Sequence, residues 1–112
     1  MEEHIINLTP ECVEYSLIFL GGISGWEQSR GYRSHVYLKK DSMQNWPLYF
    51  YDPVRLSQDL EGCSYITEHG LIIVNDVTID RIVSTVKSLI EDDYFSYQKC
   101  FTTSEIAKLY CL

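Results

Sequence analysis

The sequence lacks any long apolar run: a helix that crosses a bilayer needs about 20 consecutive apolar residues, and no segment approaches that length. It also lacks the mark of a secretory signal. The opening residues, Met1-Glu2-Glu3-His4, are acidic where a signal peptide is first basic and then apolar. The sequence therefore predicts a protein without a membrane segment, located in the cytoplasm.

Close pairs of metal-ligating residues are missing as well. There is no CxxC motif and no paired cysteine–histidine pattern, so no metal site is expected. Free thiols agree with a cytoplasmic location. The widely spaced cysteines are Cys12, Cys63, Cys100 and Cys111.

Basic residues are scarce: 9 Lys and Arg stand against 16 Asp and Glu, giving a formal net charge of −7. Binding to a nucleic-acid backbone needs clustered Lys and Arg, so nucleic acid is not the expected partner. An acidic chain suits a basic protein surface, because complementary fields speed encounter; the alternative reading is solubility alone. Arg30, Arg33, Lys39 and Lys40 lie between positions 30 and 40, so charge is segregated along the sequence.

Enzyme motifs are also absent, with no GxGxxG, GxxxxGK[ST] or HExxH. A thiol nucleophile would need Cys12 or Cys63 to meet a histidine, and no flanking signature supports that. A carboxylate pair for acid–base catalysis could be drawn from Asp92 and Asp93 or from Asp52 and Asp59. Adjacent carboxylates are common on protein surfaces, however, and Asp52 has a competing role as a helix cap. We therefore expect no enzymatic activity and no cofactor. The histidines that could pair with Cys12 or Cys63 are His4, His35 and His69.

The chain has the size and composition of one globular domain spanning residues 1–112, with 46% apolar and 22% charged residues. Its best helix is expected over 79–90, where apolar residues recur at three- and four-residue steps and Asp76 or Thr78 caps the first turn. Short helices are expected at 53–60, capped by Asp52, and from Thr102, where Glu105 has the capping-box spacing. The apolar stripe of the best helix comprises Ile79, Ile82, Val83, Val86, Leu89 and Ile90.

Strands are expected where apolar and polar residues alternate, at 13–19 and 32–38, and in the apolar run 47–51. The short apolar run 4–8 is expected to be a strand or an extended lead-in. Thr9-Pro10-Glu11 resembles a helix start and leaves a helical reading open there. A hairpin is expected between 65–67 and 71–75, turning at Glu68-His69-Gly70. The continuous run Leu71-Ile72-Ile73-Val74 suggests a central strand covered on both faces.

Together these elements predict an α+β fold: an antiparallel or mixed sheet with one long amphipathic helix and one or two short helices packed against it.

One local feature breaks a rule of helix design. Carboxylates are unfavourable at a helix C-terminus, where the dipole is negative, yet three of them end the helix and aromatic residues follow at once. Tyrosine is favoured as an interface anchor. The sequence therefore predicts a partner-binding surface made by Glu91, Asp92, Asp93, Tyr94 and Tyr97.

Length, acidity and the stretches 91–97 and 46–56 give the chain the character of a known group of proteins. It resembles the immunity proteins of bacterial polymorphic toxin systems, particularly those of contact-dependent growth inhibition. The resemblance implies stoichiometric inhibition of a cognate toxin domain, typically a basic nuclease, whose active site the acidic and aromatic side chains would cover. The group shares no motif, so it transfers no functional residue by position. The quoted stretches are EDDYFSY and WPLYFYDPVRL.

Two alternatives belong to other classes. The chain could be an adaptor or structural subunit with a permanent partner, or a small-molecule-binding domain with a pocket lined by Tyr and Cys. A concave apolar pocket with convergent His, Cys or carboxylate groups would favour the second.

Overall fold

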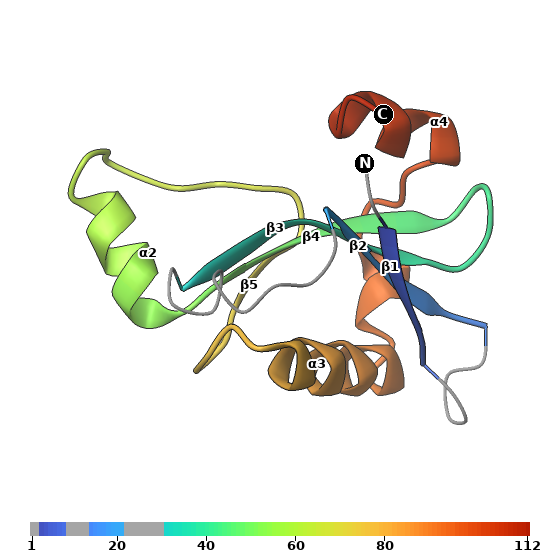
Figure 1. Ribbon diagram of the computed structural model, residues 1–112, viewed down its shortest axis with the longest axis horizontal. Coiled ribbons are helices and arrows are strands. Elements are labelled where there is room, and N and C mark those ends of the chain that lie inside the picture. Colours follow the sequence, from blue (N-terminus) through green and yellow to red (C-terminus); the bar gives the residue numbers. More distant parts are fainter. Residues whose placement is uncertain (1–2, 9–13, 22–30) are drawn as a thin grey trace.

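A computed structural model describes residues 3–8, 14–21 and 31–112. They form an α+β fold with a mixed five-stranded sheet in the order β1-β2-β3-β4-β5 (Figure 1). The first four strands are antiparallel neighbours, and β5 runs parallel to β4. The strands are β1 (Glu3–Asn7), β2 (Ser16–Leu20), β3 (Tyr32–Lys39), β4 (Asn45–Tyr51) and β5 (Leu71–Ile73). The helices of the described residues are α2 (Pro53–Leu60), α3 (Ile79–Glu91), the 3₁₀ helix η1 (Tyr94–Tyr97) and α4 (Thr103–Leu109).

The expected strands at 4–8, 13–19, 32–38 and 47–51 are confirmed as β1 to β4, with shifted ends. The possible helix start at residues 9–11 lies outside the described residues. Pro47 stands inside β4 and not at its entrance. Because proline has no backbone N–H, Pro47 cannot donate a hydrogen bond to a neighbouring strand, and the cavity described below lies at this position.

The hydrophobic core lies between the sheet and α3, which covers one face of it (Figure 1). Ile82 and Val86 are fully buried, and the other stripe residues of α3 pack around them. Thr78 is the cap, since its hydroxyl accepts from the Arg81 N–H at 3.1 Å, while Asp76 accepts from the Arg81 side chain. The amphipathic stripe is thus as expected. At 13 residues α3 is of ordinary length, so the expected long helix is not clearly shown.

The expected hairpin is wrong. Residues 65–67 form no strand; they belong to the connection that returns from α2, so β5 joins the sheet parallel to β4. β5 is an edge strand of three residues, and Ile73 is 53% exposed, so the expected central strand is wrong too. A helix between two neighbouring strands favours the parallel arrangement, and an apolar run alone does not reveal which neighbour it will have.

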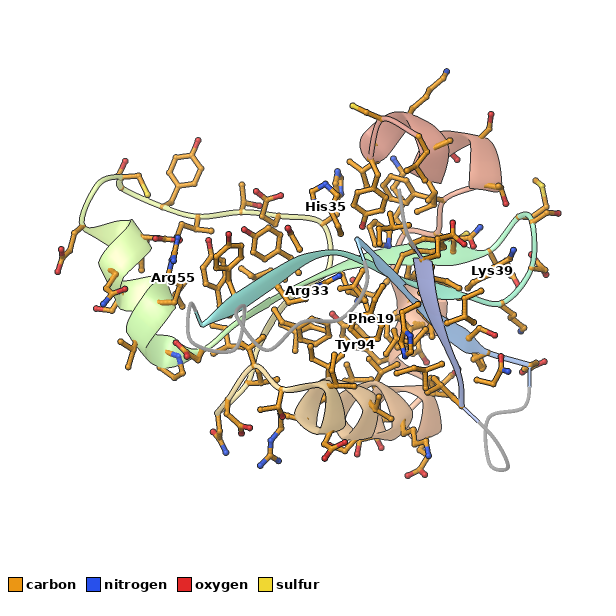
Figure 2. All side chains as sticks on the ribbon, in the orientation of Figure 1. Phe19, Arg33, His35, Lys39, Arg55 and Tyr94 are labelled. Carbon is orange, nitrogen blue, oxygen red and sulfur yellow. The ribbon has the colours of Figure 1, made fainter. Side chains whose placement is uncertain are left out.

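A β-bulge changes the faces of β3. The register shifts between Arg33 and Val36, and His35 takes a left-handed φ of 57°. Arg33 therefore faces the core at 4% exposure, where its guanidinium donates to the Leu20 carbonyl at 2.7 Å and lies 5.4 Å from the Phe19 ring centre (Figure 2). Burial of Arg33 takes it out of any basic surface in this stretch.

The opposite face of the sheet carries α4. Tyr110, at the end of α4, donates to the Val36 carbonyl at 3.1 Å, and its ring lies 5.1 Å from that of His35. The capping box of Thr102 and Glu105 is present as expected. By contrast, α2 lies beyond the end of the sheet and buries none of its residues (Figure 1). Its expected cap, Asp52, accepts from the Arg55 N–H at 2.8 Å.

Candidate functional site

The predicted binding residues form one short segment, residues 91–97, which we call the acidic–aromatic segment. Glu91 is the last residue of α3, Asp92 caps the helix, and Asp93 leaves it in a left-handed conformation at φ 57°. A short polar side chain such as Asp tolerates that conformation, so the chain turns sharply into η1. All three carboxylates are exposed.

The two tyrosines of the segment differ. Tyr97 is 82% exposed and lies on the surface with the carboxylates. Tyr94 is half-buried, packs against the core, and meets Phe95 edge-on with ring centres 5.2 Å apart. Figure 2 shows Tyr94 directed inward, between the sheet and α3. Of the five predicted residues, the three carboxylates and Tyr97 are therefore exposed, and Tyr94 is half-buried against the core.

The segment is anchored by Phe95, which is 3% exposed and lies 5.5 Å from Trp46 between ring centres. A buried aromatic side chain in the middle of η1 fixes the backbone on either side of it. The exposed carboxylates are thus held on an ordered turn, which lowers the entropy that a partner must remove on binding.

The electrostatics of the segment favour a positively charged neighbour. None of the ion pairs between described residues involves Glu91, Asp92 or Asp93. Three like charges follow one another where the helix dipole is already negative, which opposes folding by a few tenths of a kcal/mol for each charge. A cationic surface would relieve this repulsion.

A cavity of about 240 Å³ lies next to the segment. It exists because β4 has two different partners along one edge. The Asn45 N–H bonds to the Phe101 carbonyl at 2.9 Å, and the Tyr49 N–H bonds to the Gly70 carbonyl at 3.0 Å. Between them stands Pro47, which has no N–H to pair, so the two partner segments diverge there. The lining residues are Trp46, Pro47, Leu48, Glu68, His69, Gly70, Tyr94, Phe95, Gln98, Lys99 and Phe101.

The walls of this cavity are aromatic and its rim is charged. Phe101 forms one wall, fixed to Asn45 by two backbone hydrogen bonds and by the Asn45 amide at 3.0 Å, and the His69 ring meets it edge-on at 5.1 Å. Glu68 and Lys99 are exposed at the opening, and neither forms an ion pair within the described residues. The Lys99 ammonium lies 5.4 Å from the centre of the Phe101 ring.

Sequence reasoning missed every cavity residue except Tyr94. Glu68 and His69 were expected in the turn of a hairpin, and Phe101 and Lys99 carried no pattern. One signal was available: a proline inside a strand requires a neighbour that does not pair there.

Other candidates for chemistry have structural roles. The Cys63 thiol donates to the Asp59 carbonyl at 3.3 Å and makes no hydrogen bond to a histidine, while Cys12 lies outside the described residues. The Asp59 carboxylate accepts from the Tyr51 hydroxyl and from Arg55 Nε, each at 2.9 Å. Burial, followed by this hydrogen bond, raises the pKa of Tyr51. Residues 3–8, 14–21 and 31–112 contain no cluster of three His, Cys, Asp or Glu that could hold a metal ion.

None of the helices in the described part of the chain has the length and apolarity needed to cross a lipid bilayer. The chain matches no protein-family model, no curated protein and no solved structure.

Proposed function

We propose that this chain is a non-catalytic protein that binds and inhibits one protein partner with 1:1 stoichiometry, as an immunity protein does a bacterial toxin domain. The partner presents a basic surface, such as a nuclease active site, and the encounter takes place in the cytoplasm. The observation that carries the proposal is the acidic–aromatic segment: three exposed carboxylates that form no ion pair with another described residue, and a tyrosine that is 82% exposed, on a turn anchored by Phe95.

The mechanism is occlusion with electrostatic steering. The net charge of −7 attracts a cationic partner over long range, and the segment concentrates part of that charge at one point of the surface. Tyr97 supplies apolar area and a hydroxyl for the centre of the contact. A toxin whose cleft is covered in this way is closed to its anionic substrate.

The test is co-purification with proteins of the native host, followed by affinity measurement with the protein recovered. A basic domain bound in equal amount, released by salt and inhibited by the chain, supports the proposal. Neutralising the segment with E91Q/D92N/D93N should lower the association rate about tenfold while the chain stays folded. The matched control E3Q/E61Q/D80N makes the same charge change at exposed positions elsewhere and should leave most of the rate intact.

Equal effects of the two triple variants would overturn the role of the segment, because net charge alone would then explain binding. A permanent partner without inhibited activity would make the chain an adaptor. Recovery of a tight monomer with a bound small molecule would make it a ligand-binding domain.

A further inference from the structure

The cavity beside the acidic–aromatic segment is too small for a typical ligand site and large enough for one long side chain. Ligand pockets usually enclose about 300–1,000 Å³, whereas this cavity holds about 240 Å³. At protein interfaces, pockets of this kind take the side chains that dominate the binding energy, most often Trp, Tyr or Arg. Size therefore points to a side chain of a partner.

Charge selects among these side chains. The walls include the aromatic rings of Trp46, Phe95 and Phe101, and the face of an aromatic ring attracts a cation through its quadrupole. Glu68 is exposed and lines the cavity, and its carboxylate is free of ion pairs within the described residues, so it can accept a bidentate guanidinium. We infer that the cavity receives an arginine side chain of the partner, an assignment that rests on the proposed function.

Position links the cavity to the proposed interface. Tyr94 lines the cavity and belongs to the acidic–aromatic segment, and Phe95 both anchors that segment and forms part of the cavity wall. One partner surface therefore meets the exposed carboxylates and the cavity together. An arginine beside the basic patch of such a partner would enter the cavity while the patch itself contacts the carboxylates.

Lys99 is the residue that opposes this occupant. Its ammonium already lies 5.4 Å from the Phe101 ring centre, which shows that this wall attracts a cation within the molecule itself. Lys99 is exposed, and its charge also acts on the carboxylate of Glu105. The pKa of Glu105 is lowered chiefly by the hydrogen bond from the Thr102 N–H, and the charge of Lys99 also lowers it. An incoming guanidinium displaces Lys99 toward Glu105.

The experiment uses the chain without any partner. N-acetyl-arginine amide is titrated against the labelled chain, and the aromatic resonances of Trp46 and Phe101 are followed by NMR. Fluorescence is avoided because Trp26 would contribute to it. The matched probe is N-acetyl-citrulline amide, which has nearly the same shape and no charge. We expect saturable shifts at Trp46 and Phe101 with the arginine probe and little response to citrulline.

Two variants of the rim give opposite expected signs. E68Q removes the carboxylate and should weaken binding of the arginine probe about threefold, and K99Q removes the repelling charge and should strengthen it by a similar factor. A site built for an anion would show the reverse changes in affinity for the arginine probe, and a site built for a neutral aromatic group would show no change in either variant. Either of those results, or equal shifts with citrulline, overturns the assignment.

This titration separates the two proposals. Specific arginine binding at the cavity stands even when no inhibited partner is recovered, which would refute only the proposed function. Conversely, a partner that depends on Glu91, Asp92 and Asp93 but binds E68Q and K99Q like the unaltered chain would refute only the arginine pocket.

Discussion

The backbone of Gly70 lies against the carbonyl group of Pro47, so closely that a Cβ at Gly70 would collide with it. Gly70 also has a φ of +65°, a left-handed conformation that residues with a side chain rarely adopt. This contact joins the segment before β5 to the edge of β4, and it closes one side of the cavity.

Gly70→Ala should destabilise the fold by about 2–4 kcal/mol, because the methyl group adds both a collision and a strained φ. The measurement is urea unfolding followed by circular dichroism. Gly62→Ala is the control, since its Cβ would have 3.9 Å to the nearest carbonyl oxygen, and it should change stability by less than about 0.5 kcal/mol. Similar losses in the two variants would contradict the contact with Pro47.

Trp46→Phe should change the free energy of unfolding by no more than about 1 kcal/mol. The indole N–H of Trp46 is buried and has no hydrogen-bond partner among residues 3–8, 14–21 and 31–112. The substitution removes the free-energy cost of burying this N–H without a partner, which offsets the apolar area lost with the larger ring. Trp46→Ala, which leaves a cavity, should cost about 3–5 kcal/mol in the same urea experiment. A large loss in Trp46→Phe would show that the N–H is satisfied in solution.

Stability should fall as the pH rises above about 10, partly because of Tyr110. Burial, and then the charge of Tyr37, raise the pKa of Tyr110 above its ordinary value of 10.0. Below that pH the phenol is protonated whether the chain is folded or not, so its contribution is constant. Above it the unfolded chain loses the proton first, and the contribution is lost as the pH rises toward the folded-state pKa.

Tyr110→Phe should therefore flatten the alkaline fall in unfolding free energy. It should also cost about 1 kcal/mol at pH 7, because the hydrogen bond to the Val36 carbonyl is lost. Tyr97→Phe removes a phenol without a hydrogen bond in the described residues and serves as the control. An unchanged slope in Tyr110→Phe would assign the alkaline loss to other groups, such as Tyr51.

Glu91→Lys should stabilise the isolated chain by about 0.5 kcal/mol, because it replaces an unfavourable charge at the C-terminus of α3 with a favourable one. Asp80→Lys makes the same charge change in the first turn of α3 and should destabilise by a similar amount. Both effects should vanish in about 1 M salt, where charges are screened within about 3 Å. Equal signs for the two variants would refute the dipole explanation.

The sequence predicted correctly those features that depend on residues close together in the chain. The stripe of α3, the Asp52 cap of α2 and the capping box of α4 each depend on residues within a few positions of one another, and all are present. The surface position of Glu91, Asp92 and Asp93 follows from the same logic, because charged side chains stay in water unless they are paired.

Long-range features were beyond those patterns. Nothing in Leu71-Ile72-Ile73 states that β4 is its parallel neighbour, and nothing in Ser34-His35 announces the bulge that buries Arg33. The cavity is of the same kind, since it requires Pro47, Gly70 and Phe101 to meet from three parts of the chain.

The exposed position of α2 has a consequence for the way this molecule loosens. No residue of α2 is buried; its side chains contact the sheet through the hydrogen bond from Tyr51 to Asp59 and through Arg55, which lies 4.6 Å from the Tyr32 ring centre. Opening α2 therefore exposes little apolar surface, whereas opening α3 exposes the core. Amide hydrogens of α2 should exchange with solvent through this partial opening, long before those of α3. α2 thus forms a separate cooperative unit, and its exposed positions can vary without disturbing the remainder of the sheet.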